Sequence, residues 1–171
     1  HVVHFQGLTE VNIDRSEATD AGVAKLKDVP SLVVISCFLS SINGQCFKEL
    51  STLPALSGLL ASHCQLKAEN LRYLSQFPKL QLLSLDSTHL DAAGAMHLGN
   101  CKHLEDLSVK GNVRFNDRCL DYFQSLKNLK KLDLRGTSVS IVGVRKLKGI
   151  EFKQLLLPAA MEKNLAELRR I

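Results

Sequence analysis

The sequence predicts an α/β solenoid, a right-handed superhelix of about seven strand-plus-helix units with parallel strands on its concave face and helices on its convex face. An apolar template with the spacing L-x-x-L-x-L recurs along the chain, beginning near residues 8, 32, 56, 80, 104, 129 and 152. Composition agrees, because 45% of the residues are hydrophobic while only 5% are aromatic, so aliphatic side chains must form the core. Such periods are typical of repeats that bury their apolar faces only by stacking.

Within each unit, the spacing of apolar residues separates strand from helix. The second half of the template alternates with period 2, which predicts a short strand, and later apolar positions such as Val23 and Leu26 lie three apart, which predicts a helix. Good N-cap residues share one column before these helices: Thr19, Asn43, Asp91, Asn116 and Ser140. Pro30, Pro54 and Pro78 then end the helices, because proline cannot continue them.

Three segments follow from this pattern. Residues 8–157 form the repeat array, and residues 1–7 are interpreted as a remnant or an edge strand of an earlier repeat. Residues 158–171 predict a capping helix, with Leu165 and Leu168 on one apolar stripe. Since the sequence begins without an initiator Met, we expect a fragment or a processed product. We also expect a monomer, or weak association through the uncapped N-terminal edge.

Two helix starts resemble a known group of repeats. Residues 19–23 (TDAGV) and 90–94 (LDAAG) are similar to the TDAGL helix start of ribonuclease-inhibitor-like and cysteine-containing leucine-rich repeats, found in F-box adaptors and in bacterial, planctomycete-like proteins. The resemblance implies a non-catalytic module that binds a protein partner on its concave face. An alternative is a structural or regulatory arm of a larger multidomain protein, such as the substrate-recognition part of a ubiquitin-ligase adaptor, or the repeat domain of a bacterial effector or of a kinase-associated protein. The period is shorter than is usual in the F-box type, and no F-box-like segment is present.

Candidate contact residues occupy the third, fifth and seventh template positions, which point out of the concave face in such repeats. One group is apolar and falls on neighbouring repeats: Val34, Phe38, Leu60 and Leu82. Exposed apolar clusters of this kind mark interaction sites. A missing N-terminal segment that covers the cluster is the alternative explanation. The second group is basic: Lys110, Lys131 and Arg135.

Charge is distributed unevenly along the chain. Residues 1–101 carry 7 Lys and Arg against 9 Asp and Glu, whereas residues 102–171 carry 15 against 8. A basic half attracts acidic proteins or nucleic acids. However, aromatic residues for base stacking are few, and Asp106 and Asp133 interrupt the basic group. We therefore expect a solvated face and a protein partner, and we do not expect nucleic acid.

The sequence offers no convincing catalytic or metal site. The five cysteines all fall in columns that predict packing, and free buried thiols favour the cytoplasm or another reducing compartment. His63 and Cys64 are adjacent, but no third group is placed to orient the histidine. His97, Cys101 and His103 occupy ordinary core or surface columns. We expect no enzyme activity, no cofactor, no metal and, since no apolar run is long enough, no membrane insertion.

Overall fold

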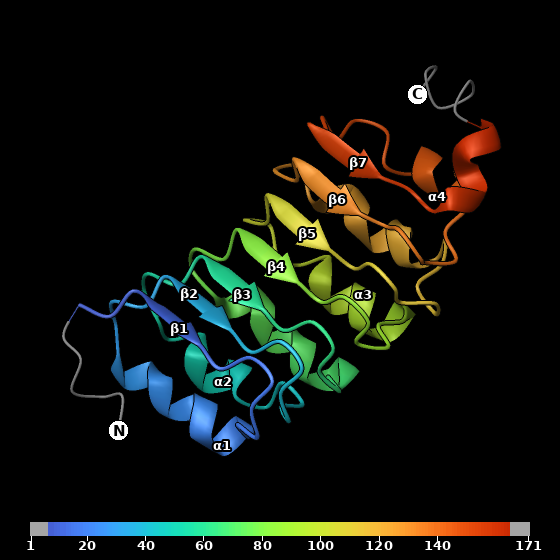
Figure 1. Ribbon diagram of the computed structural model, residues 1–171. Helices are drawn as coiled ribbons and strands as arrows, with labels where there is room; N and C mark the ends of the chain where they lie inside the picture. The colour runs from blue at the N-terminus through green and yellow to red at the C-terminus, as the bar shows by residue number, and fades with distance from the viewer. Residues whose placement is uncertain (1–6, 165–171) are drawn as a thin grey trace.

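A computed structural model describes residues 7–164 and shows seven parallel strands in one sheet, whose order in the sheet equals their order in the chain (Figure 1). The strands are β1 (Glu10–Asn12), β2 (Val34–Ser36), β3 (Gly58–Leu60), β4 (Leu82–Ser84), β5 (Asp106–Ser108), β6 (Lys131–Asp133) and β7 (Gln154–Leu156). Each strand occupies template positions three to five, and equivalent positions pair between neighbours, for example Val34 with Gly58 and Gly58 with Leu82. The predicted strands and their alignment are confirmed.

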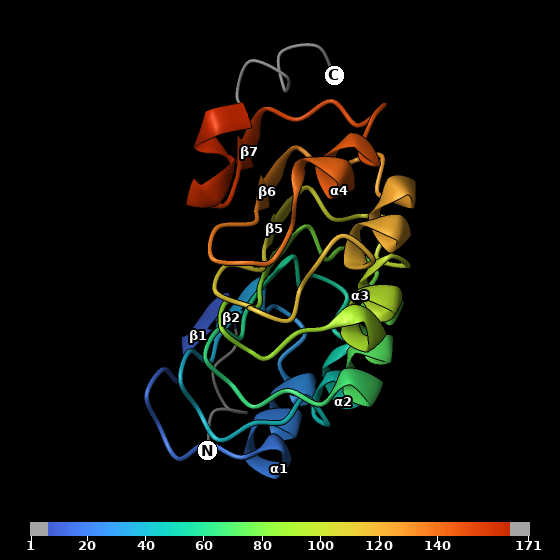
Figure 2. The ribbon, with the colours of Figure 1, turned by 90° about the vertical axis from the view of Figure 1, so that its right-hand side faces the viewer.

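Short helices form a second layer against the other side of the sheet (Figure 2). They are α1 (Asp20–Val23), η1 (Ala24–Asp28), α2 (Phe47–Leu50), η2 (Ala68–Gln76), α3 (Ala92–Leu98), η3 (Cys119–Ser125), α4 (Ile141–Arg145) and η4 (Ala159–Asn164), where η denotes a 3₁₀-helix. The sequence predicted helices without distinguishing their type. A 3₁₀-helix rises about 2.0 Å per residue against about 1.5 Å in an α-helix. A short repeat therefore spans its convex side with fewer residues.

The core lies between the two layers. The first, fourth and sixth template residues point into it, and those of the inner repeats, such as Ile35, Leu59, Leu83 and Leu107, have no solvent exposure. The terminal repeats are less enclosed, since Val11 and Leu155 are only partly buried. We call the solvent-facing side of the sheet the concave face.

A tight turn follows the strands and uses two further columns. The eighth template position has a left-handed backbone in the first six repeats, at Arg15, Leu39, His63, Ser87, Gly111 and Gly136. In five of the first six repeats, the ninth position carries a hydroxyl or amide side chain that donates to the carbonyl three residues before it; the third repeat has Cys64 there instead. Ser40 Oγ, for example, donates to the carbonyl of Cys37 at 2.7 Å, and Thr88 Oγ1 donates to that of Leu85 at 2.8 Å.

The predicted N-cap column divides into caps and turns. Asp91 and Ser140 cap α3 and α4 through their side chains, whereas Thr19 precedes α1 without a side-chain cap. Asn43 and Asn116 instead accept from the backbone N–H two residues on, which is an Asx turn. Of the expected terminal segments, residues 1–6 and 165–171, which include Leu165 and Leu168, lie outside the described residues.

Candidate binding site on the concave face

Polar side chains link consecutive repeats where the strands end. Asp14, at the seventh position of the first repeat, accepts through Oδ1 from Ser36 Oγ at 2.5 Å and from the backbone N–H of Phe38 at 2.8 Å. Ser36 and Phe38 are the fifth and seventh residues of the next repeat. One acceptor thus satisfies a hydroxyl and a backbone donor of its neighbour, and we call this arrangement a polar step.

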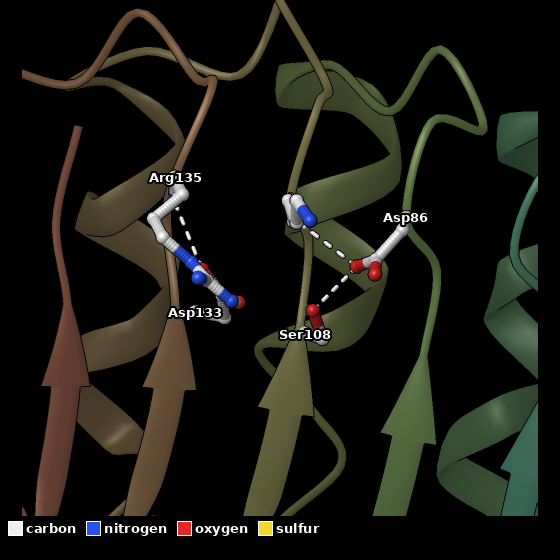
Figure 3. A network of polar contacts seen from close by, with 5 residues as sticks. Asp86, Ser108, Asp133 and Arg135 are labelled. Carbon is white, nitrogen blue, oxygen red and sulfur yellow. Dashed lines mark hydrogen bonds and ion pairs between the residues drawn. The ribbon is translucent and has the colours of Figure 1, made fainter. Parts of the chain in front are cut away.

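Two more polar steps follow in the middle of the array. Ser62 Oγ lies 2.7 Å from Ser84 Oγ and accepts from the N–H of Asp86 at 3.0 Å. Asp86 in turn accepts through Oδ1 from Ser108 Oγ and from the N–H of Lys110 (Figure 3). Each polar step combines an acceptor at the seventh position with a serine at the fifth position of the following repeat.

The other three steps lack an acceptor at the seventh position, and the serine disappears with it. Phe38 is followed by Leu60, Lys110 by Asp133, and Arg135 by Leu156. Across the six pairs of neighbouring repeats, a serine at the fifth position therefore occurs only where the preceding repeat has an acceptor at the seventh position. Four of the predicted contact residues, Phe38, Leu60, Lys110 and Arg135, lie at these interruptions.

The Phe38–Leu60 interruption contributes to a hollow on the concave face. It has a volume of about 310 Å³, and its lining comes from the first four repeats: Asp14, Ser36, Phe38, Leu60, Ser62, His63, Ser84 and Asp86. The apolar side chains of Phe38 and Leu60 lie in its middle repeats, while Asp14 and Asp86 belong to its outer repeats. We call this feature the concave hollow.

Neighbouring side chains hold the Phe38 ring in place. The ring meets the His63 imidazole edge-on, with centroids 5.0 Å apart and planes at 67°. Arg15 Cζ lies 5.8 Å from the centroid of the same ring, within the range of a cation–π contact. Phe38 remains half-buried despite these contacts, so part of the ring is open to a ligand.

The two remaining apolar candidates lie beside the hollow. Val34 and Leu82 are in register with Gly58 on the strand between them. A Cβ added to Gly58 would lie 3.2 Å from a Val34 methyl, so Val34 already covers the glycine. Leu82 is 39% exposed, the largest apolar exposure among the concave candidates. Of the four apolar candidates, Phe38 and Leu60 line the hollow, whereas Val34 and Leu82 are outside its lining.

The basic candidates are largely occupied by neighbouring acids. Lys131 Nζ lies 3.4 Å from Asp106 Oδ2, and Arg135 Nη2 lies 2.6 Å from Asp133 Oδ2 (Figure 3). Burial tends to raise the pKa of Asp133, but the hydrogen bonds and charge of Arg135, with the charge of Lys110, outweigh it and hold the pKa below its ordinary value. No ion pair of Lys110 is seen within residues 7–164.

Sequence reasoning assigned no role to Asp14, Asp86 or His63 on this face. Asp14 and Asp86 occupy the outward-facing seventh column, where a polar side chain is ordinary and by itself predicts no role. The signal that could have identified them is the joint change of seventh and fifth positions between consecutive repeats. For His63, the sequence suggests only a pairing with the adjacent Cys64.

The thiols are structural. All five cysteines are free and buried. Hydrogen bonds from Cys37 and Ser40 favour a pKa of about 6 for Cys64, yet Cys64 Sγ lies 3.0 Å from the carbonyl oxygen of Cys37. That contact needs the thiol proton, because the carbonyl would repel a thiolate, and we therefore assign a neutral thiol.

The described part of the chain has neither a metal-ligand cluster nor a membrane-spanning helix. Between residues 7 and 164 no group of three or more His, Cys, Asp or Glu residues is arranged to hold a metal ion. Nor does any helix there have the length and apolarity needed to cross a bilayer.

Comparison with known proteins supports the fold. No protein-family model and no curated protein matches the sequence. Among solved structures, the chain resembles one described as a TLR13–ssRNA13 complex, with a TM-score of 0.59 at 19% identity. The likeness covers 91% of this chain but only 26% of the other, so the chain spans about a quarter of that protein's length. With its parallel seven-stranded sheet and its stacked repeats, the chain has the fold of a leucine-rich-repeat protein.

Proposed function

We propose that the chain is a non-catalytic interaction module whose concave face binds a protein partner. The contact centres on Val34, Phe38, Leu60 and Leu82. The observation that carries this proposal is the interruption of the polar steps at Phe38 and Leu60. There the concave face exchanges satisfied polar groups for apolar side chains, and the concave hollow results.

Burial of these side chains supplies the driving force. Water leaves apolar surface favourably, at roughly 25 cal/mol per Å² removed from solvent. Phe38, Leu60 and Leu82 keep part of their surface exposed. The leucines that point to the other side of the same sheet, such as Leu59 and Leu83, are fully buried. Val34 and Leu82 extend this apolar surface beside the hollow, and Lys110, Lys131 and Arg135 provide polar contacts at its far end.

Nucleic acid is the second ligand class to consider. The similar structure is described as a complex with ssRNA, so the sequence-based expectation against nucleic acid is not supported. The geometry still favours protein, because Lys131 and Arg135 are paired with acids and two carboxylates line the hollow. Phosphate backbones need unpaired cations and are repelled by carboxylates.

A broader role concerns the protein of which this chain is a part. A leucine-rich-repeat array can serve as the recognition arm of a larger protein, such as a ubiquitin-ligase adaptor. The ribonuclease-inhibitor-like subtype is likewise a proposal that rests on the helix-start motifs. Both possibilities are compatible with protein binding on the concave face.

Affinity capture from a lysate of the source cells tests the proposed surface. The wild type is compared with Phe38→Asp plus Leu82→Asp, and with a matched convex control, Met96→Asp plus Val142→Asp. Met96 and Val142 are 45% and 59% exposed, so the control also adds two charges at exposed apolar positions. Circular dichroism checks that each variant is folded, with Phe38→Ser plus Leu82→Ser as the substitute if the aspartates unfold the chain.

The proposal is supported if the concave variant loses a protein partner that the wild type and the convex control both retain. Equal capture by all three chains would show that this surface is not the binding site. Nuclease treatment separates the ligand classes, since capture that ends with RNA digestion would assign the surface to RNA.

A further inference from the structure

The proposed function does not specify which kind of partner segment binds. The lining of the concave hollow indicates its chemistry. Resting on that function, we propose that the hollow binds an extended segment of a partner protein with the pattern basic–x–apolar–x–basic. Asp14 and Asp86 receive the two basic side chains. Phe38 and Leu60 receive the apolar side chain between them.

Both carboxylates have an oxygen available for a partner. Asp14 and Asp86 each use Oδ1 to accept from a serine and a backbone N–H. Over residues 7–164 the structure records no hydrogen bond to either Oδ2 and no ion pair of either residue. Each carboxylate is also held in place by its polar step. A bound cation therefore meets an oriented acceptor, and little side-chain freedom is lost on binding.

The spacing of the carboxylates matches an extended chain. Asp14 and Asp86 occupy the same template position three repeats apart, and neighbouring strands lie about 4.8 Å apart, which places them about 14 Å apart. An extended chain rises about 3.4 Å per residue, so four residues also span about 14 Å. Side chains at the first, third and fifth residues of such a segment point to one side. The middle one then faces the Phe38–Leu60 interruption.

Charge complementarity selects basic side chains. Residues 1–101 carry an excess of acidic groups although the whole chain has a net charge of +5. One guanidinium already lies against an apolar side chain of the lining, because Arg15 Cζ is 5.8 Å from the centroid of the Phe38 ring. Arg15 is also a like charge that a basic segment must approach, so its removal should favour binding.

Fluorescence anisotropy with labelled synthetic peptides tests the pattern. The probe carries two arginines four residues apart with a leucine midway, matching the extended-chain spacing. Its control has the same composition with the arginines adjacent. We expect the spaced peptide to bind at least about fivefold more tightly, the difference that one lost surface ion pair of about 1 kcal/mol produces.

Substitutions in the protein test the two carboxylates. Asp14→Asn and Asp86→Asn keep the Oδ1 acceptor of the polar step and remove only the charge. Each substitution should weaken binding of the spaced peptide by about fivefold, and this loss of affinity should be smaller at high salt. Glu69→Gln removes an exposed charge from the helix layer and should leave binding unchanged. Arg15→Gln should strengthen binding by about twofold, a gain that a folding defect cannot produce.

Several outcomes would overturn the inference. These are equal binding of the spaced and adjacent peptides, insensitivity to both aspartate substitutions, or tighter binding of a labelled single-stranded RNA that strengthens when the aspartates are neutralised. If the peptides fail while lysate capture still depends on Phe38 and Leu82, the charge pattern is wrong and the proposed function stands. If substitution of Phe38 and Leu82 leaves lysate capture unchanged, the proposed function itself is wrong.

Discussion

Asn112 shows how one side chain joins two repeats. It is 1% exposed, and its Oδ1 accepts from the N–H groups of Thr88 and Leu90 at 2.9 Å each. Its Nδ2 donates to the carbonyls of Leu85 and Val109 at 2.8 Å each. The amide therefore satisfies both its own turn and that of the preceding repeat.

Asn112→Ala should lower the free energy of unfolding by about 3 kcal/mol, because buried backbone groups lose their partners at about 1–3 kcal/mol each. The matched control is Asn128→Ala. Asn128 is exposed and donates to the carbonyl of Lys102, so its loss should cost within about 0.5 kcal/mol. Urea unfolding measures both. Equal losses for the two variants would contradict the structural role of Asn112.

The left-handed turn column gives a second prediction about single residues. Gly111 has φ +73°, and an added Cβ would lie 2.5 Å from Ser87 Oγ, while Ser87 itself has φ 52°. Ser87→Gly should stabilise by about 0.5 kcal/mol, since relief of a left-handed conformation exceeds the entropic cost of glycine. Gly111→Ala should destabilise by about 2 kcal/mol and by less in the Ser87→Gly background, where the close oxygen is gone. Thermal unfolding of the double-mutant cycle measures this, and identical losses in both backgrounds would rule out the contact.

At the scale of elements, strands were more predictable than helices. A strand needs only alternation in a template, and each repeat supplies it. Whether the helix layer is α or 3₁₀ depends on how many residues remain to cross the convex side, a tertiary constraint that local spacing does not reveal. Likewise, good capping residues at Asn43 and Asn116 formed Asx turns, because the helical segments after them begin several residues later.

The two kinds of helix start can be distinguished by mutation. Asp91 accepts from the N–H groups of Ala93 and Gly94 at 3.0 and 3.2 Å, whereas Thr19 makes no side-chain cap. Asp91→Ala should cost about 1 kcal/mol, and Thr19→Ala should cost a few tenths at most. Chemical denaturation provides the measurement. A loss at Thr19 as large as that at Asp91 would contradict this assignment.

At the scale of the whole molecule, repeats contact mainly their neighbours, so stability should be highest in the middle of the array. In the described residues β1 and β7 each pair with one strand, and their central residues, Val11 and Leu155, are only partly buried. Amide hydrogen exchange in this 171-residue chain should be slowest in β3, β4 and β5 and faster in β1 and β7. Uniform protection across the seven strands would indicate a single cooperative unit instead.

The site was less predictable than the fold. The template places Phe38, Leu60, Asp14 and Asp86 on one face, but it does not say that the two carboxylates share a hollow with the ring. It also places Arg135 and Asp133 on this face, but it does not say that the Arg135 side chain folds back onto Asp133. Both facts depend on side-chain rotamers and on contacts between repeats, which a single repeat does not encode.

The polar steps also restrict how this array can change its length. Removing the repeat that contains β4 would set Ser62 against Ser108, an acceptor against a hydroxyl, and the match would survive. Removing the repeat that contains β2 would instead place the Asp14 carboxylate against Leu60 and leave the carboxylate without its serine partner. Duplications and deletions are therefore not equivalent along the chain. At each boundary, the seventh position of one repeat must match the fifth position of the next. A deletion that separates Phe38 from Leu60 would also remove the hollow.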